Sequence, residues 1–343
     1  MDRFLQSVWY ERKSQWFSLL LWPLSLLFAA VVAFRRAAYR NGWFRSFRVA
    51  RPVIIVGNIT VGGTGKTPMT IWLAEHLHSR GLRVGIVLRG YGGRSTQWPR
   101  DVTKETSSQE VGDEAVLLAQ RTGALVVAGP DRVAAANRVI ERGAEVVLCD
   151  DGLQHYRLAR DAEIAVVDER RGLGNGRMLP AGPLREPARR LASVDVTVRT
   201  RRSVASMTLK SPSGCSVVAT PTLREAISIT TGEHRPLQSF KGMQVHAVAG
   251  IGNPQAFFDA LSALGVKVDP HPLPDHARLS VGNLAFPDRA PVLMTEKDAV
   301  KCQSGAHGHP NELWAVRMDV ALNAADTQIL QQLLDRVLAA KKL

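Results

Sequence analysis

The feature of this chain that most constrains its fold is a short apolar run that leads directly into a glycine-rich loop. The run, Val53–Gly57, is rich in β-branched residues and predicts a buried parallel strand. The loop that follows, Thr60–Thr67, reads TVGGTGKT, and after it apolar residues recur at near-helical spacing. A strand, a glycine-rich loop and a helix in this order are typical of a site that binds the phosphate groups of a nucleotide.

The residue types in this loop suit a bound triphosphate. Glycines let successive backbone N–H groups point at phosphate oxygens, and the N-terminus of the next helix adds a positive dipole end. We expect Lys66 to neutralise the β- and γ-phosphates and to act in catalysis, and the Thr67 hydroxyl to bind Mg²⁺. The predicted ATP-binding residues are Thr60, Val61, Gly62, Gly63, Thr64, Gly65, Lys66 and Thr67. Thr60 replaces the first glycine of the usual motif, and the alternative is a glycine-rich turn that binds nothing.

A second acidic element follows another apolar run. Residues 145–150 predict a strand that ends in Asp150, and Asp151 and Gly152 come next. A carboxylate at the carboxyl end of a parallel strand lies beside the phosphate loop, where it can hold Mg²⁺ directly or through water. Both aspartates are candidate metal ligands, but on an extended backbone they cannot face the same ion, so which one binds it stays open. The alternative is an ordinary Asp-Asp-Gly turn.

Further strand and helix patterns alternate along the first two hundred residues. Strands are predicted at 84–88, 125–128 and 164–167, and crossover helices at 66–79, 112–122 and 131–142. This order predicts a parallel sheet covered by helices on both faces, with polar loops meeting at one edge. The expected fold class is therefore α/β: a doubly wound, mainly parallel sheet of the P-loop NTPase type, with a smaller C-terminal α/β domain and an N-terminal hydrophobic helix.

The length of 343 residues and changes in composition suggest more than one structural unit. Shorter predicted strands at 245–249 and 292–295, with a helix at 254–264, indicate a smaller C-terminal domain. The predicted boundaries are 1–50 for a membrane-associated helical segment, 51–200 for the P-loop core, 201–240 for a linker or strand pair, and 241–343 for the C-terminal α/β domain.

The N-terminal segment contains 19 consecutive residues without charge, Trp16–Phe34. This length is near the minimum needed to cross a hydrocarbon layer about 30 Å thick. More arginines follow the segment than precede it, which predicts that the rest of the chain lies on the cytoplasmic face of the inner membrane. Pro23 and the surrounding aromatic residues also suit a helix embedded in one leaflet. A full span, shallow insertion and a buried core hairpin remain alternatives.

The formal charge of +13 implies an anionic partner, which can be a nucleotide, a nucleic acid or an acidic membrane. Much of this charge flanks the apolar segment, and the sequence contains no base-stacking or groove-reading module. Anionic membrane lipid is therefore the expected partner rather than nucleic acid, and no obligate protein partner is predicted. The three cysteines are too few and too scattered for a disulfide framework or a structural zinc site of thiolates.

Eight short motifs, found in order along nearly the whole chain, resemble those of the tetraacyldisaccharide 4′-kinases of lipid A biosynthesis. The matching segments are Thr60–Thr67, Arg89–Gly92, Val111–Glu114, Asp150–His155, Leu179–Glu186, Ala249–Pro254, Pro274–His276 and Thr295–Asp298. The resemblance implies transfer of the γ-phosphate of ATP, with Mg²⁺, to the 4′-hydroxyl of the acylated glucosamine disaccharide 1-phosphate, which gives lipid IVA. It also implies that Thr60 in place of glycine is ordinary.

A sugar hydroxyl is a weak nucleophile, so this reaction needs a carboxylate that accepts its proton. Asp113 is the best candidate, and the resemblance implies that it acts with His276 as a catalytic pair. Glu114 is expected to complete the magnesium shell with Asp150 or Asp151. Alternatively, Asp113 and Glu114 only stabilise the N-terminus of a helix.

Four other polar residues are weaker candidates. Arg132 is placed where it could contact phosphates, and His155 could touch the nucleotide or the acceptor. Arg185 and Asn175 suit the 1-phosphate and the hydroxyls of the acceptor. Each of them can equally have a structural or surface role.

The competing function is a membrane-associated P-loop ATPase or GTPase that acts as a switch and has no metabolite acceptor. Two details oppose it. Val61 stands where such ATPases often carry a lysine, and Lys297 is one position away from the guanine-reading N-K-x-D pattern.

Overall fold

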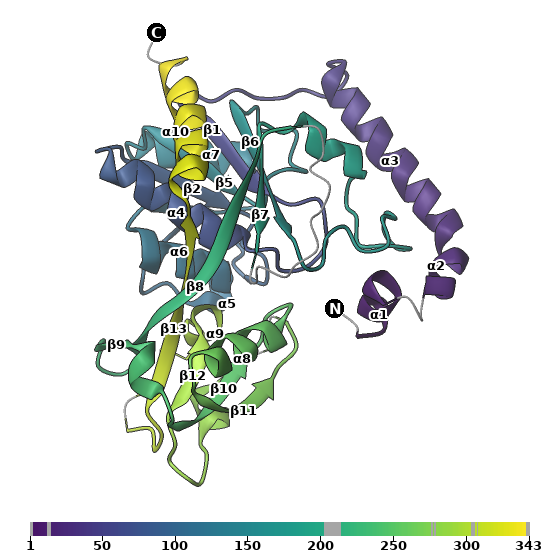
Figure 1. Ribbon diagram of the computed structural model, residues 1–343. Helices are drawn as coiled ribbons and strands as arrows, with labels where there is room; N and C mark the ends of the chain where they lie inside the picture. Colours follow the sequence, from purple (N-terminus) through teal and green to yellow (C-terminus); the bar gives the residue numbers. More distant parts are fainter. Residues whose placement is uncertain are drawn as a thin grey trace.

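The computed structural model describes residues 3–11, 15–201, 214–275, 277, 279–302, 306 and 308–340. These residues form one large sheet with helices on both faces and a helical N-terminal arm beside it (Figure 1). From edge to edge the strands are β11 (Lys267–Pro272), β10 (Gln244–Ala249), β12 (Val292–Thr295), β13 (Leu313–Leu322), β8 (Ser216–Ser228), β7 (Val196–Thr200), β6 (Ala162–Asp168), β1 (Val53–Gly57), β5 (Val146–Asp150), β2 (Val84–Leu88), β4 (Leu125–Ala128) and β3 (Arg100–Val102).

The phosphate-loop strand β1 lies between β5 and β6, in the parallel part of the sheet. In-register pairs such as Ile55 with Cys149 and Val56 with Asp150 bring the end of β1 beside the acidic end of β5. Every residue of β1, β2 and β5 is buried, because helices cover both faces. The predicted α/β fold with a mainly parallel sheet is confirmed, and the short edge strand β3 is antiparallel.

Alternating side chains of β1 pack into two different hydrophobic cores. Ile54 points into a core with residues of α4 (Lys66–Ser79), α6 (Asp113–Thr122) and α10 (Ala324–Ala339). Ile55 points into the opposite core, with residues of α7 (Arg132–Glu141). Because Ile54 and Ile55 are both fully buried, truncating either side chain to alanine lowers the free energy of unfolding by about 2–5 kcal/mol.

The C-terminal half continues the same sheet. β13 pairs in parallel with β12 and antiparallel with β8, and β8 pairs in parallel with β7, so two long strands join the two halves (Figure 1). This half has cores of its own, built around residues such as Phe240 and Phe257. The predicted domain boundaries remain predictions, since the hydrogen-bonded ladder crosses them without a break.

The remaining elements of the sheet-bearing part are short. They are α5 (Ser108–Val111), α8 (Pro254–Ala263), α9 (Glu296–Ala299), β9 (His234–Pro236), and the 3₁₀ turns η2 (Ala188–Ser193), η3 (Leu237–Phe240) and η4 (Val281–Leu284).

The N-terminal arm consists of α1 (Arg3–Tyr10), α2 (Gln15–Leu20) and α3 (Trp22–Arg40). Pro23 lies in the first turn of α3, where its missing N–H costs nothing, and so the apolar run is divided between two helices. The inner side of the arm is tied to the loop before Leu184, since the hydroxyls of Ser18 and Ser25 donate hydrogen bonds to Ala181 O and Met178 O, both at 2.6 Å.

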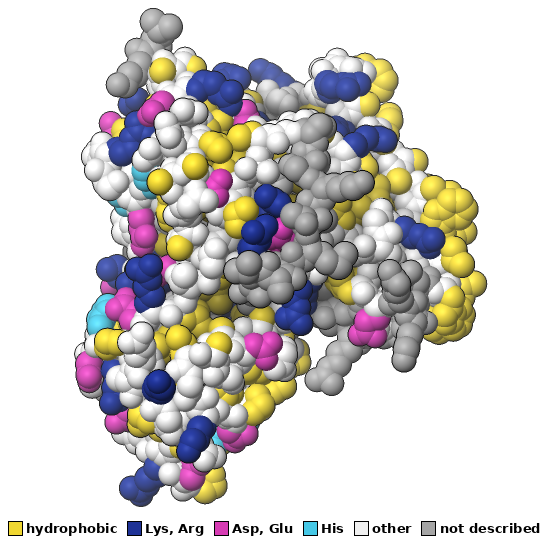
Figure 2. All heavy atoms as spheres, viewed as in Figure 1, with side chains coloured by type: hydrophobic (Ala, Val, Ile, Leu, Met, Phe, Trp, Pro, Cys, Tyr) yellow, Lys and Arg dark blue, Asp and Glu magenta, His cyan; other side chains and the backbone are white. Residues whose placement is uncertain are grey.

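The outer side of the arm is apolar and exposed. Leu20 and Leu27 are 69% and 64% exposed, and Figure 2 shows hydrophobic side chains gathered along this arm. The arrangement differs from the buried core hairpin considered above, because these side chains face outward. No helix among the described residues combines the length and the apolar run required to cross a membrane.

Candidate active site

The glycine-rich loop occupies the gap between β1 and α4, at the carboxyl edge of the sheet. Gly62 and Gly65 have φ angles of +105° and +90°, in the left-handed region that favours glycine. Thr60 needs no such freedom, because it forms an antiparallel bridge with Leu184. The side-chain amide of Asn58 donates to Gly62 O at 3.3 Å and to Thr64 Oγ1 at 3.1 Å. The loop is therefore held open around the backbone N–H groups that begin α4.

Lys66 begins α4 and faces the second aspartate of the acidic element. Its Nζ lies 3.5 Å from Asp151 Oδ1, and Arg185 Nη1 donates to both oxygens of the same carboxylate at 3.1 Å. Burial works against ionisation of Asp151, but the two cations outweigh it and lower its pKa to about 2. Asp151 is therefore a carboxylate that positions Lys66 and Arg185.

Asp150 has a different environment, although it is the next residue in the chain. Its side chain is buried, and it accepts a hydrogen bond from Thr70 Oγ1 at 3.1 Å. Burial first, and then the negative charge of Glu114, raise its pKa to about 7, while Lys66 partly offsets the increase. The chain turns sharply after Asp150, since Asp151 has a φ of +50°. The two carboxylates have different hydrogen-bond partners, Thr70 for Asp150 and Arg185 for Asp151.

These acidic residues fit a magnesium ion. Glu114 and Asp151 both lie close enough to Asp150 for their charges to affect it, and the three carboxylates supply the hard oxygen ligands that Mg²⁺ prefers. Asp150 is engaged by one hydroxyl, whereas both oxygens of Asp151 are engaged by cations. The donor set therefore favours Asp150 over Asp151 as the ligand, with Glu114 and with Thr67 in the first turn of α4.

Asp113 is placed by an unusually close approach of two loops. It is the first residue of α6, and Gly112 before it has a φ of +87°. A Cβ at Gly112 would lie 2.2 Å from the carbonyl oxygen of Tyr91, so only glycine lets the segment 89–92 pack here. The carboxylate of Asp113 is buried and lies 3.5 Å from Lys301 Nζ.

Asp113, Glu114, Asp150 and Asp151 form what we call the acidic cluster. Two lysines of the C-terminal half complete it, and sequence reasoning did not assign these lysines a role. Lys297 Nζ lies 3.3 Å from both Glu114 Oε1 and Asp275 Oδ1. Lys301 Nζ lies 2.9 Å from Asp298 Oδ1 and also approaches Asp113. In the sequence, Lys297 lies within the motif Thr295–Asp298, whereas Lys301 lies three residues beyond it.

Asp298 anchors the segment that brings this half to the phosphate loop. It is fully buried and accepts hydrogen bonds from Gly250 N at 2.8 Å and Thr295 Oγ1 at 2.6 Å. Two residues after Gly250, a Cβ added at Gly252 would lie 3.1 Å from Gly63 N. The loop after β10 therefore lies directly against the glycine-rich loop, in contact with backbone that would bind phosphate.

The predicted partner of Asp113, His276, lies outside the described residues. Asp275, its neighbour in the chain, is described and joins the cluster through Lys297. The catalytic pair of Asp113 and His276 therefore stays a prediction.

The weaker candidates divide into one that joins the site and three that do not. Arg185 joins it through Asp151. Asn175 uses its amide to donate to Ser18 Oγ at 3.1 Å and Ala181 O at 2.8 Å, so it ties the N-terminal arm to the core. Arg132 is buried and donates to Gly129 O at 2.9 Å.

His155 is the third candidate outside the cluster. Burial, followed by the positive charges of Arg132 and Arg160, lowers its pKa to about 4. It is therefore a neutral imidazole packed among arginines, which indicates a structural role.

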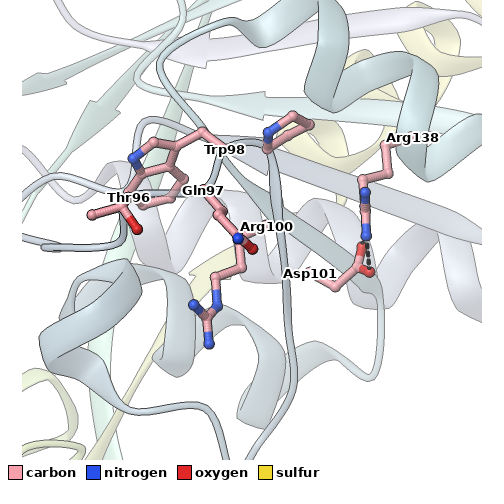
Figure 3. Close-up of a pocket in the computed structure, with 7 residues that line it drawn as sticks. Thr96, Gln97, Trp98, Arg100, Asp101 and Arg138 are labelled. Carbon is pink, nitrogen blue, oxygen red and sulfur yellow. Dashed lines mark hydrogen bonds and ion pairs between the residues drawn. The ribbon is translucent and has the colours of Figure 1, made fainter.

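A shallow surface hollow of about 620 Å³ lies away from these residues, at the edge strand β3 (Figure 3). It is lined by residues 96–101 and by Arg138, which donates to both oxygens of Asp101 at 2.9 and 2.7 Å. None of its lining residues belongs to the acidic cluster, so we do not assign it to the active site.

Comparisons with known proteins identify the family to which the chain belongs. The family model of the tetraacyldisaccharide-1-P 4′-kinases matches residues 17–339. The tetraacyldisaccharide 4′-kinase of Alkalilimnicola ehrlichii is 48% identical over 333 residues, 97% of each chain, and that of Pseudomonas aeruginosa PAO1 is 45% identical over 338 residues, 98% of each chain. The crystal structure of LpxK from Aquifex aeolicus in complex with ATP is similar, with a TM-score of 0.80 and 29% identity, covering 94% of this chain and 99% of that one. The strand order, the phosphate loop and these matches together show that the chain belongs to the tetraacyldisaccharide 4′-kinase family.

Proposed function

We propose that this protein transfers the γ-phosphate of ATP to the 4′-hydroxyl of a tetraacylated glucosamine disaccharide 1-phosphate and so forms lipid IVA. The observation that carries the proposal is the acidic cluster: Asp113 and Glu114 of α6 lie with Asp150 beside the glycine-rich loop, and two lysines of the C-terminal half bind to them. Family membership supplies the identity of the acceptor.

Each part of the cluster has a role in this reaction. The backbone N–H groups of the loop and Lys66 bind the triphosphate and orient its terminal phosphoryl group. Asp113 accepts the proton of the sugar hydroxyl, and Lys301 Nζ lies 3.5 Å from its carboxylate. Glu114, Asp150 and Thr67 would hold Mg²⁺, which when bound neutralises charge on the phosphate oxygens.

The kinase assay uses the full chain with γ-labelled ATP, Mg²⁺ and the acylated disaccharide monophosphate in detergent. We expect label in the lipid product, and we expect Asp113→Asn to lower turnover by about 10²–10⁴-fold, because the proton then has no acceptor. Lys104→Ala, at an exposed lysine that does not belong to the cluster, is the control and should keep full activity. Hydrolysis of ATP without any labelled lipid would indicate the switch function instead.

We also propose that the protein works at the cytoplasmic face of the inner membrane, with the outer side of the arm against anionic lipid. The α3 surface, formed by Leu24, Leu27, Val31 and Phe34, repeats at helical spacing, and every member is more than half exposed. Leu20, the last residue of α2, is exposed as well. Arginines follow it in the chain, where they suit acidic head groups. Such a position would hold the active site next to a substrate whose acyl chains lie in the bilayer.

Co-sedimentation with vesicles tests this placement. We expect the protein to pellet with vesicles that contain phosphatidylglycerol and to bind less well to pure phosphatidylcholine or at high salt. The double variant Leu24→Ser, Leu27→Ser removes apolar contact area without touching the core and should lose most of the binding. Unchanged binding of this variant would contradict the assignment of the α3 surface.

A further inference from the structure

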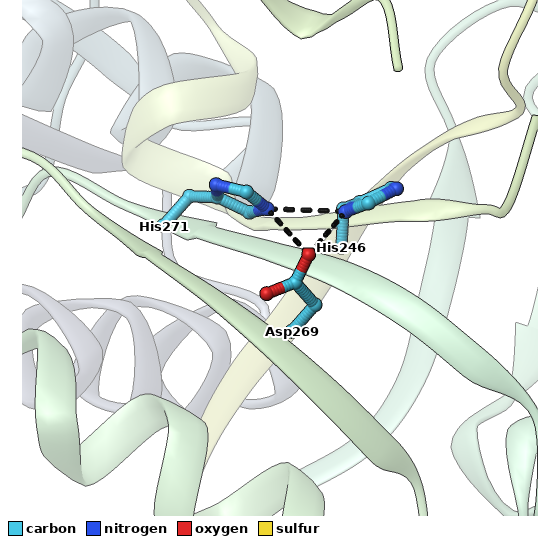
Figure 4. A group of neighbouring side chains, drawn as sticks. All are labelled: His246, Asp269 and His271. Atoms are coloured by element: carbon cyan, nitrogen blue, oxygen red, sulfur yellow. Dashed lines mark hydrogen bonds and ion pairs between the residues drawn. The ribbon is translucent and has the colours of Figure 1, made fainter. Parts of the chain in front are cut away.

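A compact cluster of two histidines and one aspartate lies on the sheet of the C-terminal half, outside the acidic cluster of the active site (Figure 4). His246 Nδ1 lies 3.0 Å from His271 Nε2 and 3.1 Å from Asp269 Oδ2. His271 Nε2 lies 3.3 Å from the same carboxylate oxygen. Three potential ligand atoms therefore face one another at the corners of a small triangle.

The strand register produces this cluster. β10 and β11 pair in parallel, with His246 opposite Asp269, and His271 follows two positions later on the same face. Side chains on one face of neighbouring strands are held close together by the backbone ladder. The triangle is therefore set by two strands of regular structure.

The close contact between His246 Nδ1 and the carboxylate of Asp269 needs an explanation. Asp288 Oδ1 lies 2.9 Å from His246 Nε2, and an ionised carboxylate can only accept, so Nε2 carries the proton of that bond. In a neutral His246 the Nδ1 atom then presents a lone pair to the carboxylate oxygen of Asp269. Two electron-rich atoms at this distance repel each other unless a proton or a metal cation lies between them.

We propose that His246, Asp269 and His271 form a binding site for a divalent transition metal ion, with Zn²⁺ as the best match. Two imidazole nitrogens and one carboxylate oxygen are a ligand set that Zn²⁺ prefers, and Mg²⁺ does not. Ligand atoms bound at about 2.0–2.2 Å around a tetrahedral ion lie about 3.3–3.5 Å apart. The observed separations of 3.0, 3.1 and 3.3 Å reach this geometry with small side-chain movements.

The surroundings suit such an ion. Asp288 fixes the tautomer of His246 from the far side of the ring, which is the usual outer partner of a metal-bound histidine. Phe286 stacks on the same ring, with centroids 3.7 Å apart, and holds its orientation. The side chains of Asp269 and His271 are 46% and 32% exposed, so an ion can enter from solvent and keep a water as its fourth ligand.

The expected role of the ion is to clamp two strands. β11 lies at the edge of the sheet, and within the described residues it pairs with β10 alone. The carboxyl end of β10 leads to Gly252 beside the phosphate loop, and that of β11 leads to Asp275 in the acidic cluster. A bound ion would therefore stabilise the pair of strands that delivers both segments to the active site.

The test is calorimetric titration of the full chain with Zn²⁺, in chelator-free buffer that contains excess Mg²⁺ to occupy the acidic cluster. We expect one Zn²⁺ per chain and a rise in the thermal unfolding midpoint, because the ion binds the folded state. Co²⁺ in its place should give the visible absorption of a site with nitrogen ligands. Asp269→Asn and His271→Gln, both at partly exposed positions, should each weaken Zn²⁺ binding by at least about tenfold, as should Asp288→Asn.

His234→Gln is the matched control. This exposed histidine of the same half contacts Glu225 at 3.3 Å, and the substitution should leave Zn²⁺ binding unchanged. Absence of binding in the wild-type chain would overturn the proposal and indicate that a protonated His246 bridges Asp269 and Asp288. Binding that survives both Asp269→Asn and His271→Gln, or that is lost only in Asp150→Asn, would also overturn it, since the ion would then lie elsewhere.

Discussion

The Nζ atom of Lys297 lies 3.3 Å from a carboxylate oxygen of Glu114, a residue 183 positions earlier in the chain. This contact joins the C-terminal half to the helix that carries the proposed catalytic base. Burial disfavours the charge of Lys297, but the neighbouring carboxylates of Glu114 and Asp275 raise its pKa overall. The lysine therefore stays charged and holds together acidic groups from both halves.

Replacing this lysine by an apolar residue of similar length should weaken both the fold and the reaction. We expect Lys297→Met to lower the free energy of unfolding by about 1–3 kcal/mol, less than for a fully buried pair because Glu114 is about one third exposed. Turnover should fall at least about tenfold, since Glu114 loses the cation that orients it. Urea unfolding and the kinase assay measure the two effects, with Lys104→Met as the control.

Lys66 should matter more for activity than for stability. We expect Lys66→Ala to lower turnover by at least about 100-fold, because the phosphoryl group loses a positive charge that it needs in the transition state. Asp151 keeps Arg185 as a partner, so the unfolding midpoint should change little. A variant that retains wild-type turnover would remove Lys66 from the mechanism.

Asp150 should show the opposite signs for stability and activity. Its folded pKa of about 7 lies above the ordinary aspartate value of 3.8, so the ionised carboxylate destabilises the metal-free protein, and this penalty grows as pH rises from about 4 to about 7. In chelator at about pH 8, Asp150→Asn should therefore raise the free energy of unfolding, on the order of 2 kcal/mol. In the kinase assay with Mg²⁺, the same variant should lose activity. A variant that is both active and no more stable would show that Asp150 is not the metal ligand.

His155 predicts a pH dependence of stability. Its folded pKa of about 4 is below the unfolded value of 6.5, so in this range the unfolded chain binds more protons. The contribution of neutral His155 to the free energy of unfolding is fully present above about pH 6.5 and is lost progressively as pH falls toward about 4. His155→Gln should therefore lose less stability than the wild type between about pH 7 and pH 5, as measured by urea midpoints. Parallel pH curves for the two proteins would show that His155 does not titrate in this way.

Gly112 should tolerate no side chain. A Cβ there would lie 2.2 Å from Tyr91 O, at a φ of +87°, so Gly112→Ala must displace the start of α6 and with it Asp113. We expect a loss of about 1–3 kcal/mol in the free energy of unfolding, together with much lower turnover. Gly282→Ala is the control, because nothing lies within 4 Å of its added Cβ. Equal stability of the two variants would contradict the close packing of these loops.

Much of the kinase-type core was predictable from the sequence because its signals are local. The helix predicted at 66–79 is α4 with the same bounds, and the strand predicted at 84–88 is β2. Apolar periodicity and turn residues act within a few positions, so they can be recognised without knowledge of the fold. The same locality explains why Thr60–Thr67 and Asp150 are recognisable from the sequence as candidate site residues.

Long-range partners could not be predicted in this way. Asn175 was expected near the acceptor, but its amide is used to hold the N-terminal arm. The adjacent aspartates 150 and 151 could not be distinguished either. Their difference comes from Thr70, Lys66 and Arg185, which are brought there by other elements.

The sequence by itself determined that a strand, a phosphate-binding loop and a helix lie in series, that acidic residues end a neighbouring strand, and that an apolar segment precedes them, because each depends on residues close together in the chain. Only the tertiary structure decided that Lys297 binds Glu114 and that His246, Asp269 and His271 meet on one face of the sheet. Such contacts depend on strand order and register, which are fixed by the packing of the whole chain and leave no periodic pattern in the sequence.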